Sequence, residues 1–224
     1  MSWIADNLGL VGELTLEHLR QSAPPILAGL AIAVPLGWLA HRFRSVRGLV
    51  LTVTGVLYTL PSLALLPLLP VIFGISALSE LNLVLALTIY AVAILVRFAA
   101  DGFDSVDAEV RRAALAMGYG PFRRFWGVEL PLAGPVILAG LRVTAVSTIA
   151  LATVGILIGV TNLGYLFTNG FQRRIVEEIF AGVAAVALVA LVVDLLLVAL
   201  GRVLMPWTVA LGARGAVSTV GGHG

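Results

Sequence analysis

The segment DSVDAEVRRAALAMGYGPFRRFWGVELP, residues 104–131, is the only long charged segment between two apolar runs of this chain. The run before it ends in IYAVAILV at 89–96, and the run after it begins with LAGPVILAGL at 132–141. Similar apolar runs recur along the whole sequence, and they are long enough, at about 20 residues, to cross a bilayer as helices. This alternation predicts an all-α fold, a polytopic bundle of membrane helices.

The composition indicates that lipid is the main solvent of the chain. Of the 224 residues, 60% are hydrophobic and 12% are charged, and the mean hydropathy is +1.06. A surface that faces water cannot be built from so few polar groups. The formal net charge is only +2, and the arginines stand between apolar runs, so they indicate membrane orientation and no nucleic-acid partner.

Five apolar runs are expected to cross the membrane, namely 24–40, 48–74, 81–96, 132–160 and 179–204. The second run is longer than one span requires. It contains Pro61, Pro67 and Pro70, so its helix is expected to break near Leu60. Irregular backbone at membrane depth must be buried in protein or face water, and the break is therefore expected to lie away from lipid.

The arginines predict the orientation, because positive residues are retained on the cytoplasmic side. One side carries most of them, at positions 42, 44, 47, 97, 111, 112, 123, 124, 202 and 214, and the other side carries those at 20, 173 and 174. The chain is therefore expected to form a single transmembrane domain over 1–224, with its N-terminus outside and its C-terminus inside. Residues 104–131 are expected in the cytoplasm, and 208–224 as a flexible tail.

Within 104–131 the sequence predicts two short helices at the membrane surface. Asp104 can cap a first helix that runs through Met117, and Gly118 can end it in a left-handed conformation. A second helix is expected to start at Pro121 and to end at Pro131.

The first of these helices carries an apolar stripe. Val106, Val110, Ala113 and Met117 follow helical spacing, with Ala114 beside them. The small side chains at 113 and 114 allow another surface to approach closely. Spacing alone leaves two interpretations open, since the stripe could pack on its own bundle or receive a partner.

The order of small residues in this segment resembles a known family. The segment resembles the E-A-A-x3-G-x9-I-x-L-P loop of ABC importer permeases. The matching residues are AA at 113–114, G at 118 and VELP at 128–131. In that family the loop forms a coupling helix that docks in a cleft of the ATPase subunit. The resemblance implies an ATPase-coupling role for Val110, Arg112, Ala113, Ala114, Met117, Gly118, Leu130 and Pro131. Arg112 is a departure, because the family usually has glutamate there.

Other stretches resemble the osmoprotectant branch of these permeases, among them LPSLALLPLLP at 60–70 and NLGYLFTNGFQ at 162–172. The branch imports quaternary amines such as glycine betaine, choline or carnitine across the bacterial cytoplasmic membrane. The resemblance implies a multi-pass permease that works with two copies of an ATPase, an extracytoplasmic solute-binding protein and a second permease subunit. That second subunit could be identical, but the unusual Arg112 favours a different one.

Two alternatives stay open on the sequence. The coupling loop is common to many ABC importers, so the solute could be another small molecule such as an amino acid. A secondary transporter or channel is the other option, although such carriers usually have more spans and an inverted repeat.

The residue inventory predicts a transport subunit and no enzyme. All 14 basic residues are arginine, and without lysine a P-loop cannot form, so ATP hydrolysis is expected in a partner chain. Cysteine is absent, and His18, His41 and His223, placed near ends or loops, show no spacing typical of a metal site. No catalytic residue, metal or cofactor is expected.

Two further groups are candidates inside the membrane. Tyr58, Pro61, Ser62 and Thr148 are candidates for the wall of the translocation path, because they lie on the broken second run and the glycine-containing fourth run.

Arg142 and Asp194 lie within spans, each about 15 Å from the cytoplasmic end. Charges at that depth need a partner or water, and a structural ion pair between them is favoured over contact with substrate.

Overall fold

A computed structural model describes residues 2–207 of the chain, and the predicted tail at 208–224 lies outside the described residues. Within the described part all regular structure is helical. Four helical stretches are long and apolar enough to cross a membrane: Leu8–Arg42, Glu80–Asp104, Pro121–Ile158 and Val176–Leu204. A fifth span is formed if the bent pair Arg44–Thr59 and Ser62–Phe73 crosses as one. The predicted all-α bundle of about five spans is confirmed.

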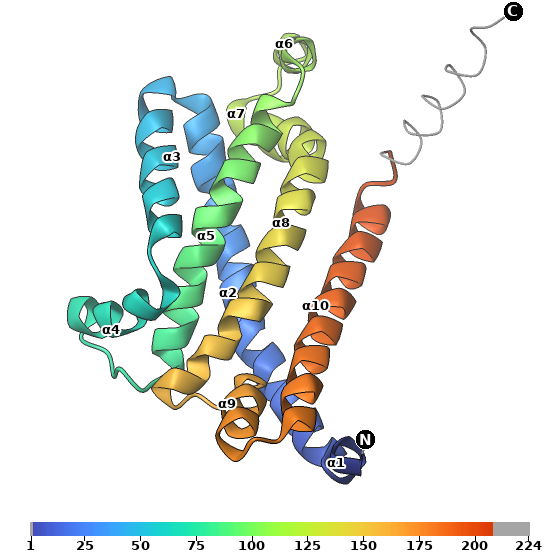
Figure 1. Cartoon of the computed structure of the whole chain (residues 1–224). Coiled ribbons are helices and arrows are strands. Elements are labelled where there is room, and N and C mark those ends of the chain that lie inside the picture. Colours follow the sequence, from blue (N-terminus) through green and yellow to red (C-terminus); the bar gives the residue numbers. More distant parts are fainter. Residues whose placement is uncertain (1, 208–224) are drawn as a thin grey trace, which may run out of the picture.

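The long helices form one layered bundle (Figure 1). α3 (Arg44–Thr59), α5 (Glu80–Asp104), α8 (Leu130–Ala152) and α10 (Val176–Leu204) lie side by side on one face, and α2 (Leu8–Arg42) crosses behind α5 and α8. The short helices α1 (Ser2–Asp6) and α9 (Gly164–Arg173) lie at one end.

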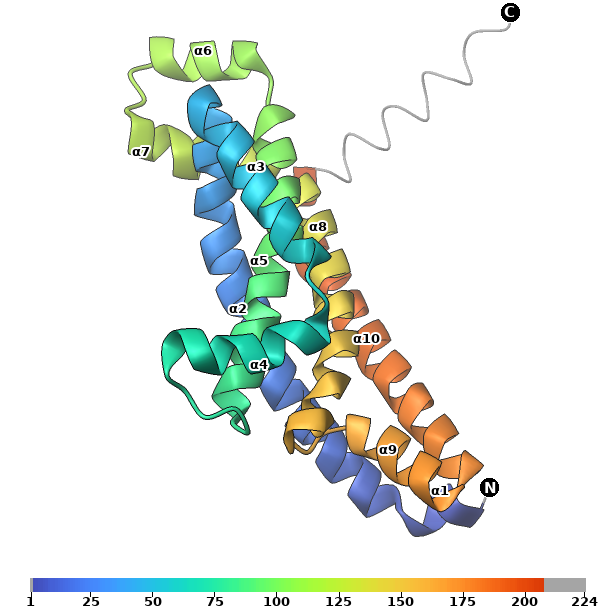
Figure 2. The same ribbon diagram turned by 60° about the vertical axis from the view of Figure 1, so that its left-hand side comes forward.

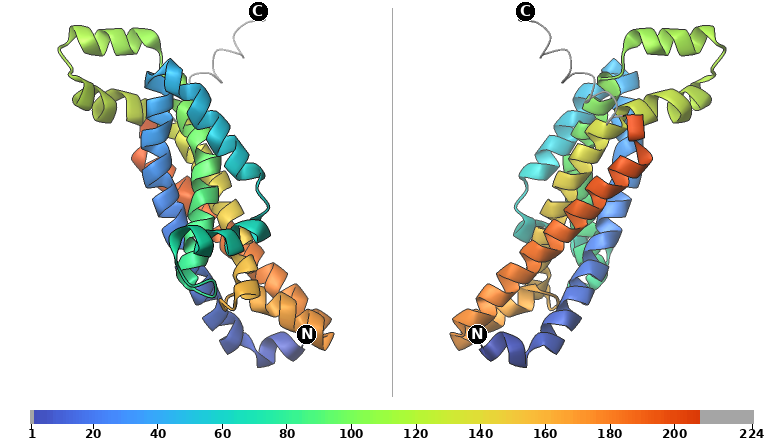
Figure 3. Two further views of the ribbon diagram at one scale, coloured as in Figure 1. Left: turned by 90° about the vertical axis from the view of Figure 1, so that its left-hand side faces the viewer. Right: turned by 90° about the vertical axis from the view of Figure 1, so that its right-hand side faces the viewer.

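Residues 104–131 lie at the opposite end from α9 and the N-terminus (Figure 3). The predicted orientation requires that separation. Which end faces the cytoplasm stays a prediction, because no membrane accompanies the helices.

The packing of α2 on α5 depends on small residues. Gly29, Ala33 and Gly37 are four residues apart on one buried face of α2. A Cβ added to Gly29 would lie 2.6 Å from the Cβ of Ala91, and one added to Gly37 would lie 2.4 Å from the Cβ of Ala99. The two helix backbones therefore approach as closely as glycine allows, which is how membrane helices gain van der Waals contact.

The first span is longer than the run at 24–40 that the sequence predicts. α2 begins at Leu8, and its 35 residues extend about 52 Å, more than a bilayer core requires. Charged residues in 13–20 hide the first part of the helix from a hydropathy count. Leu14, however, packs against Ile149, Leu163 and Leu166, and this contact holds that part of the helix on the bundle.

The predicted break near Leu60 is confirmed. α3 and α4 (Ser62–Phe73) meet there at a bend of 111° (Figure 2). The hydroxyl of Tyr90 on α5 donates a hydrogen bond to the carbonyl of Leu60. This bond satisfies a backbone acceptor that the break frees at membrane depth, where no bulk water is at hand.

The seam between α2 and α5 can be tested with two matched substitutions in one helix. Gly37→Ala should lower the free energy of unfolding by about 1–3 kcal/mol, because the new methyl group overlaps Ala99. Gly12→Ala meets no atom within 4 Å, and it should raise stability by up to about 1 kcal/mol through helix propensity. Thermal unfolding of the purified protein in detergent measures both. Effects of the same sign would contradict the close approach.

Candidate functional site

Residues 104–131 form a helical hairpin at one end of the bundle (Figure 2). α6 (Ala108–Ala116) is followed by Gly118 at φ 78°, and α7 (Pro121–Arg124) returns toward the bundle. The predicted left-handed end at Gly118 is therefore present. Asp104 as the N-cap is wrong, because α5 continues to that residue and Asp107 takes the cap, accepting a bond from the Glu109 amide at 2.7 Å.

The second expected helix does not end at Pro131. α7 passes through a π turn at Phe125–Glu129 directly into α8, so the chain is helical from Pro121 to Ile158. The amide of Leu130 bonds to the carbonyl of Phe125, five residues earlier, which shifts the helical register immediately before the proline. Pro131 is the second residue of α8, and its missing amide donor falls where the π turn has already interrupted the regular hydrogen-bond pattern.

A chain of charged and polar groups fastens the start of the hairpin to the bundle. Arg111 on α6 donates from Nη1 to Nε2 of His41 at 2.6 Å, and Nδ1 of His41 lies 2.5 Å from Asp104. Arg47 on α3 donates to the other oxygen of Asp104 at 2.7 Å. Because arginine can only donate, His41 accepts at Nε2 and carries its proton on Nδ1. These groups join the ends of α2, α3 and α5 to α6.

A second, buried network fastens the other end of the hairpin. Arg124 donates from Nε to Glu129 at 2.7 Å, and the indole of Trp38 on α2 donates to the second carboxylate oxygen at 3.0 Å. The ring of Phe125 packs edge-on against Trp38, with centroids 5.5 Å apart. The charged pair is almost inaccessible, so both charges depend on these partners.

The structure divides the eight candidate coupling residues into two groups. Val110, Arg112, Ala113, Met117 and Gly118 are exposed on the hairpin. Of the others, Ala114 is 1% exposed, whereas Leu130 and Pro131 are partly buried at the start of α8, with Leu130 packed near Phe103.

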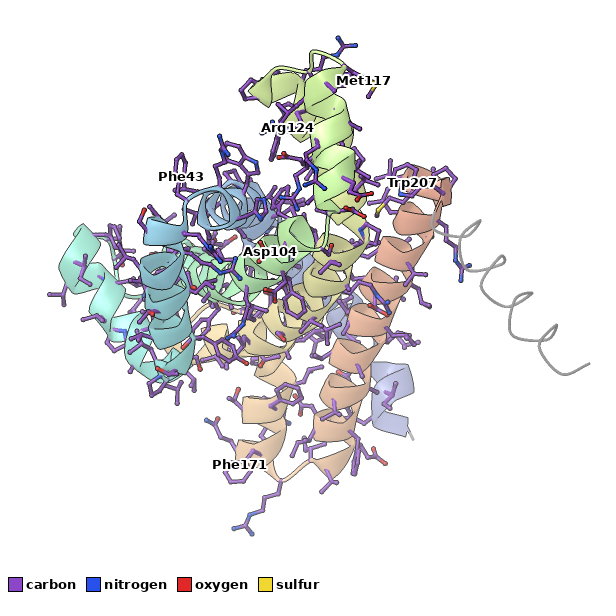
Figure 4. The ribbon with its side chains drawn as sticks, turned by 90° about the horizontal axis from the view of Figure 1, so that it is seen from above. Phe43, Asp104, Met117, Arg124, Phe171 and Trp207 are labelled. Carbon is purple, nitrogen blue, oxygen red and sulfur yellow. The ribbon has the colours of Figure 1, made fainter. Side chains whose placement is uncertain are left out.

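Val106 does not continue the apolar stripe of α6, because it precedes the helix and is buried. The outer surface of the hairpin nevertheless carries exposed apolar side chains, beside the charged Glu109, Arg112 and Arg123. Val110, Met117, Phe122 and Trp126 are exposed there, and the last two rings stack edge-on. Viewed from this end, Met117 lies at the outer edge of the hairpin and Asp104 over the bundle (Figure 4). Exposed apolar groups of this kind mark contacts with another protein or with the membrane surface.

The four candidate path residues do not line one cavity. Tyr58 lines a cavity of about 300 Å³ between α3, α5 and α8, whereas Ser62 lines a smaller one beside Tyr90. Pro61 lies at the break itself. Thr148 is buried in α8, and its hydroxyl has no hydrogen-bond partner in the part of the chain that the structure describes.

Arg142 and Asp194 form a two-pronged ion pair between α8 and α10. Nε and Nη2 of Arg142 each lie 2.7 Å from one carboxylate oxygen. The side chains are 41% and 22% exposed, and they line an open hollow with Val143 and Ser147. The pair therefore lies on the face where α3, α5, α8 and α10 are side by side, and not in the core of the bundle.

A buried polar network on α2 escaped the sequence analysis. His18, expected near a helix end, is fully buried in α2, and its Nε2 lies 2.9 Å from the carbonyl of Ile149. Gln21 accepts from Asn162 at 2.8 Å, and Asn162 also accepts from the amide of Gly164. The polar residues at 18, 21 and 22 share one face of a helix, and this pattern in the sequence could have indicated the network. The network fixes the loop before α9.

The chain is similar to known membrane transport proteins. A family model described as "Binding-protein-dependent transport system inner membrane component" matches residues 33–209. The osmoprotectant import permease protein OsmW of Salmonella typhimurium is 32% identical over 91% of this chain and 96% of that protein. The glycine betaine/carnitine/choline transport system permease protein OpuCD of Bacillus subtilis is 32% identical, over 92% and 89% respectively.

Solved structures give the same fold. A chain of the MetNI methionine ABC transporter, in an inward-facing conformation, superposes with a TM-score of 0.79 over 89% of this chain and 98% of that one. The sequence identity is 17%, so this likeness concerns the fold alone.

A double-mutant cycle tests whether Arg142 and Asp194 stabilise each other. Arg142→Ala and Asp194→Ala should each lower the unfolding temperature of the purified protein, because each leaves a charge without its partner. The double variant should recover much of the loss. Arg202→Ala combined with Asp194→Ala is the control and should be additive. Strict additivity in the first cycle as well would contradict a stabilising pair.

Proposed function

The chain belongs to the family of inner membrane components of binding-protein-dependent transport systems, and on that premise we propose that it is the permease subunit of an ATP-driven importer for quaternary amines such as glycine betaine, choline or carnitine. The observation that carries the proposal is similarity over nearly the whole length of both chains to permeases with those names. A shared fragment would not extend over nine-tenths of each protein. The membrane is proposed to be the bacterial cytoplasmic membrane, with the N-terminus outside.

The hairpin α6–α7 is the proposed docking site for the ATPase. It has the two properties that coupling requires, since it is fastened to the bundle at both ends and exposes apolar side chains at its outer surface. Arg111 and Arg124 transmit force to α2 and α8, and Val110, Ala113 and Met117 are available to a partner. ATP hydrolysis is proposed to take place in two ATPase copies, since this chain has no lysine for a P-loop.

The extracytoplasmic solute-binding protein is proposed to dock at the opposite end, where α9 and the N-terminus lie (Figure 3). About five spans cannot enclose a path alone, so a second permease is proposed to face this one.

Arg112 bears on the identity of the second permease. Its side chain is 72% exposed, and Glu109 lies 3.8 Å away, so its positive charge is presented to whatever docks on α6. An ATPase cleft that fits glutamate would repel it. The second permease is therefore proposed to be a different chain that keeps the glutamate. Two alternatives remain. The ATPase could carry a compensating acidic residue, in which case the purified complex would contain this permease alone. Position 112 could instead be solvated and without effect, in which case Arg112→Glu would leave coupling unchanged.

Uptake measurements test the proposed function. Cells without osmoprotectant importers should take up labelled glycine betaine or choline when they express this chain with its ATPase, binding protein and second permease. Uptake should cease when the ATPase carries an inactivating substitution. Preference for an amino acid would contradict the substrate class, and uptake without the ATPase would indicate a secondary transporter or channel.

Two neighbouring alanines separate docking from folding. Ala113→Trp enlarges an exposed position, so it should weaken ATPase association about tenfold or more without changing thermal stability. Ala114→Trp places the indole in the buried interior of the hairpin, so it should lower thermal stability itself. Co-purification and thermal unfolding measure the two effects. Normal association and uptake in Ala113→Trp would overturn the docking proposal.

A further inference from the structure

Arg97 is a charged residue inside a membrane helix, and it has no partner in the part of the chain that the structure describes. The sequence predicts Arg97 in the cytoplasmic segment. In the structure α5 continues to Asp104, so Arg97 lies seven residues, or about 10 Å, before the end of the helix. It is exposed, and it has no hydrogen bond or ion pair within residues 2–207. A cation at that depth requires water or an anionic partner, because lipid cannot solvate it.

Arg97 lines the cavity of about 300 Å³ beside Tyr58. Tyr58 and Thr54 reach it from α3, Phe98 from α5 and Val143 from α8. The position of Phe98 is fixed by close packing, since a Cβ added to Gly140 of α8 would lie 2.3 Å from its Cβ. The cavity has the size of a site for a small solute and offers one cation and two aromatic rings.

This cavity lies on the face that carries the other membrane charges. Val143 lines both it and the hollow that contains Arg142 and Asp194. Seen from the hairpin end, α3 and α10 flank this face, with α5 and α8 between them (Figure 4). The carboxylate of Asp194 is occupied by Arg142, whereas the guanidinium of Arg97 is free among the described residues. The face therefore retains one unpaired positive charge.

We propose that Arg97, with the rings of Tyr58 and Phe98, forms a subsite on the translocation path that binds the carboxylate of a zwitterionic quaternary amine. The guanidinium pairs with the carboxylate, and an aromatic ring faces the methylated ammonium group. Glycine betaine and carnitine have both groups, whereas choline has no carboxylate. The inference rests on the proposed function and adds to it a preference among its solutes.

The test uses the complete importer in liposomes, with the binding protein saturated with glycine betaine or choline in turn. Arg97→Gln should lower glycine betaine transport about tenfold and change choline transport less than about twofold. Arg97→Lys should retain an intermediate rate, because it keeps the charge but loses the two-pronged geometry. Arg44→Gln, which removes an exposed arginine at the start of α3 outside the cavity, is the control and should change neither rate.

Several outcomes would overturn the inference. Equal loss of both solutes, or reduced thermal stability of Arg97→Gln, would mean that Arg97 pairs with a protein group. Equal rates in wild type and Arg97→Gln would remove the subsite. An effect seen only in liposomes that contain phosphatidylglycerol would assign the cation to a lipid phosphate. Choline transport by the wild type without glycine betaine transport would refute the carboxylate preference alone. Transport of neither solute would instead refute the proposed function.

If the wild type transports glycine betaine and not choline, the glycine betaine rates and the thermal stabilities of the variants still test the subsite. A lower glycine betaine rate in Arg97→Gln, with unchanged thermal stability and partial recovery in Arg97→Lys, supports the subsite. An unchanged rate overturns it.

Discussion

The close approach of α2 and α5 is the contact on which the other parts of the protein depend. In lipid, helices gain little from burying apolar surface against each other, and association depends on packing and on hydrogen bonds. Glycines at 29 and 37 permit that packing. α5 then places Tyr90 at the break between α3 and α4, Arg97 at the cavity, and Asp104 at the base of the hairpin.

α2 contributes the other half of the same arrangement. Its last two turns carry Trp38 and His41, and each receives one end of the hairpin through a charged residue. Nearer its start, His18 and Gln21 hold the loop before α9 at the far end. One helix therefore contacts the elements at both ends of the bundle.

Hydropathy and proline positions were sufficient to predict the number of spans and the break at Leu60. They were insufficient where tertiary contacts outweigh local signals. The first part of α2 carries charges but packs on α8 and α9, and Pro131 follows a π turn that keeps the chain helical. The pairing of Arg142 with Asp194 could be predicted because both residues lie on regular helices at the same distance from the expected cytoplasmic ends. His41, one partner of Asp104, and Trp38, one partner of Glu129, lie 63 and 91 positions away from them in the chain, and sequence spacing gives no access to such pairs.

α10 has few neighbours within its own chain. Only 6% of its most apolar window is buried, while Asp194 on α10 and its partner Arg142 on α8 are only partly buried. Within the described residues, α10 therefore presents an apolar flank with an ion pair that the chain covers only in part. Wherever lipid meets this flank, the partly covered ion pair needs water, and local thinning of the bilayer supplies that water at a cost in free energy.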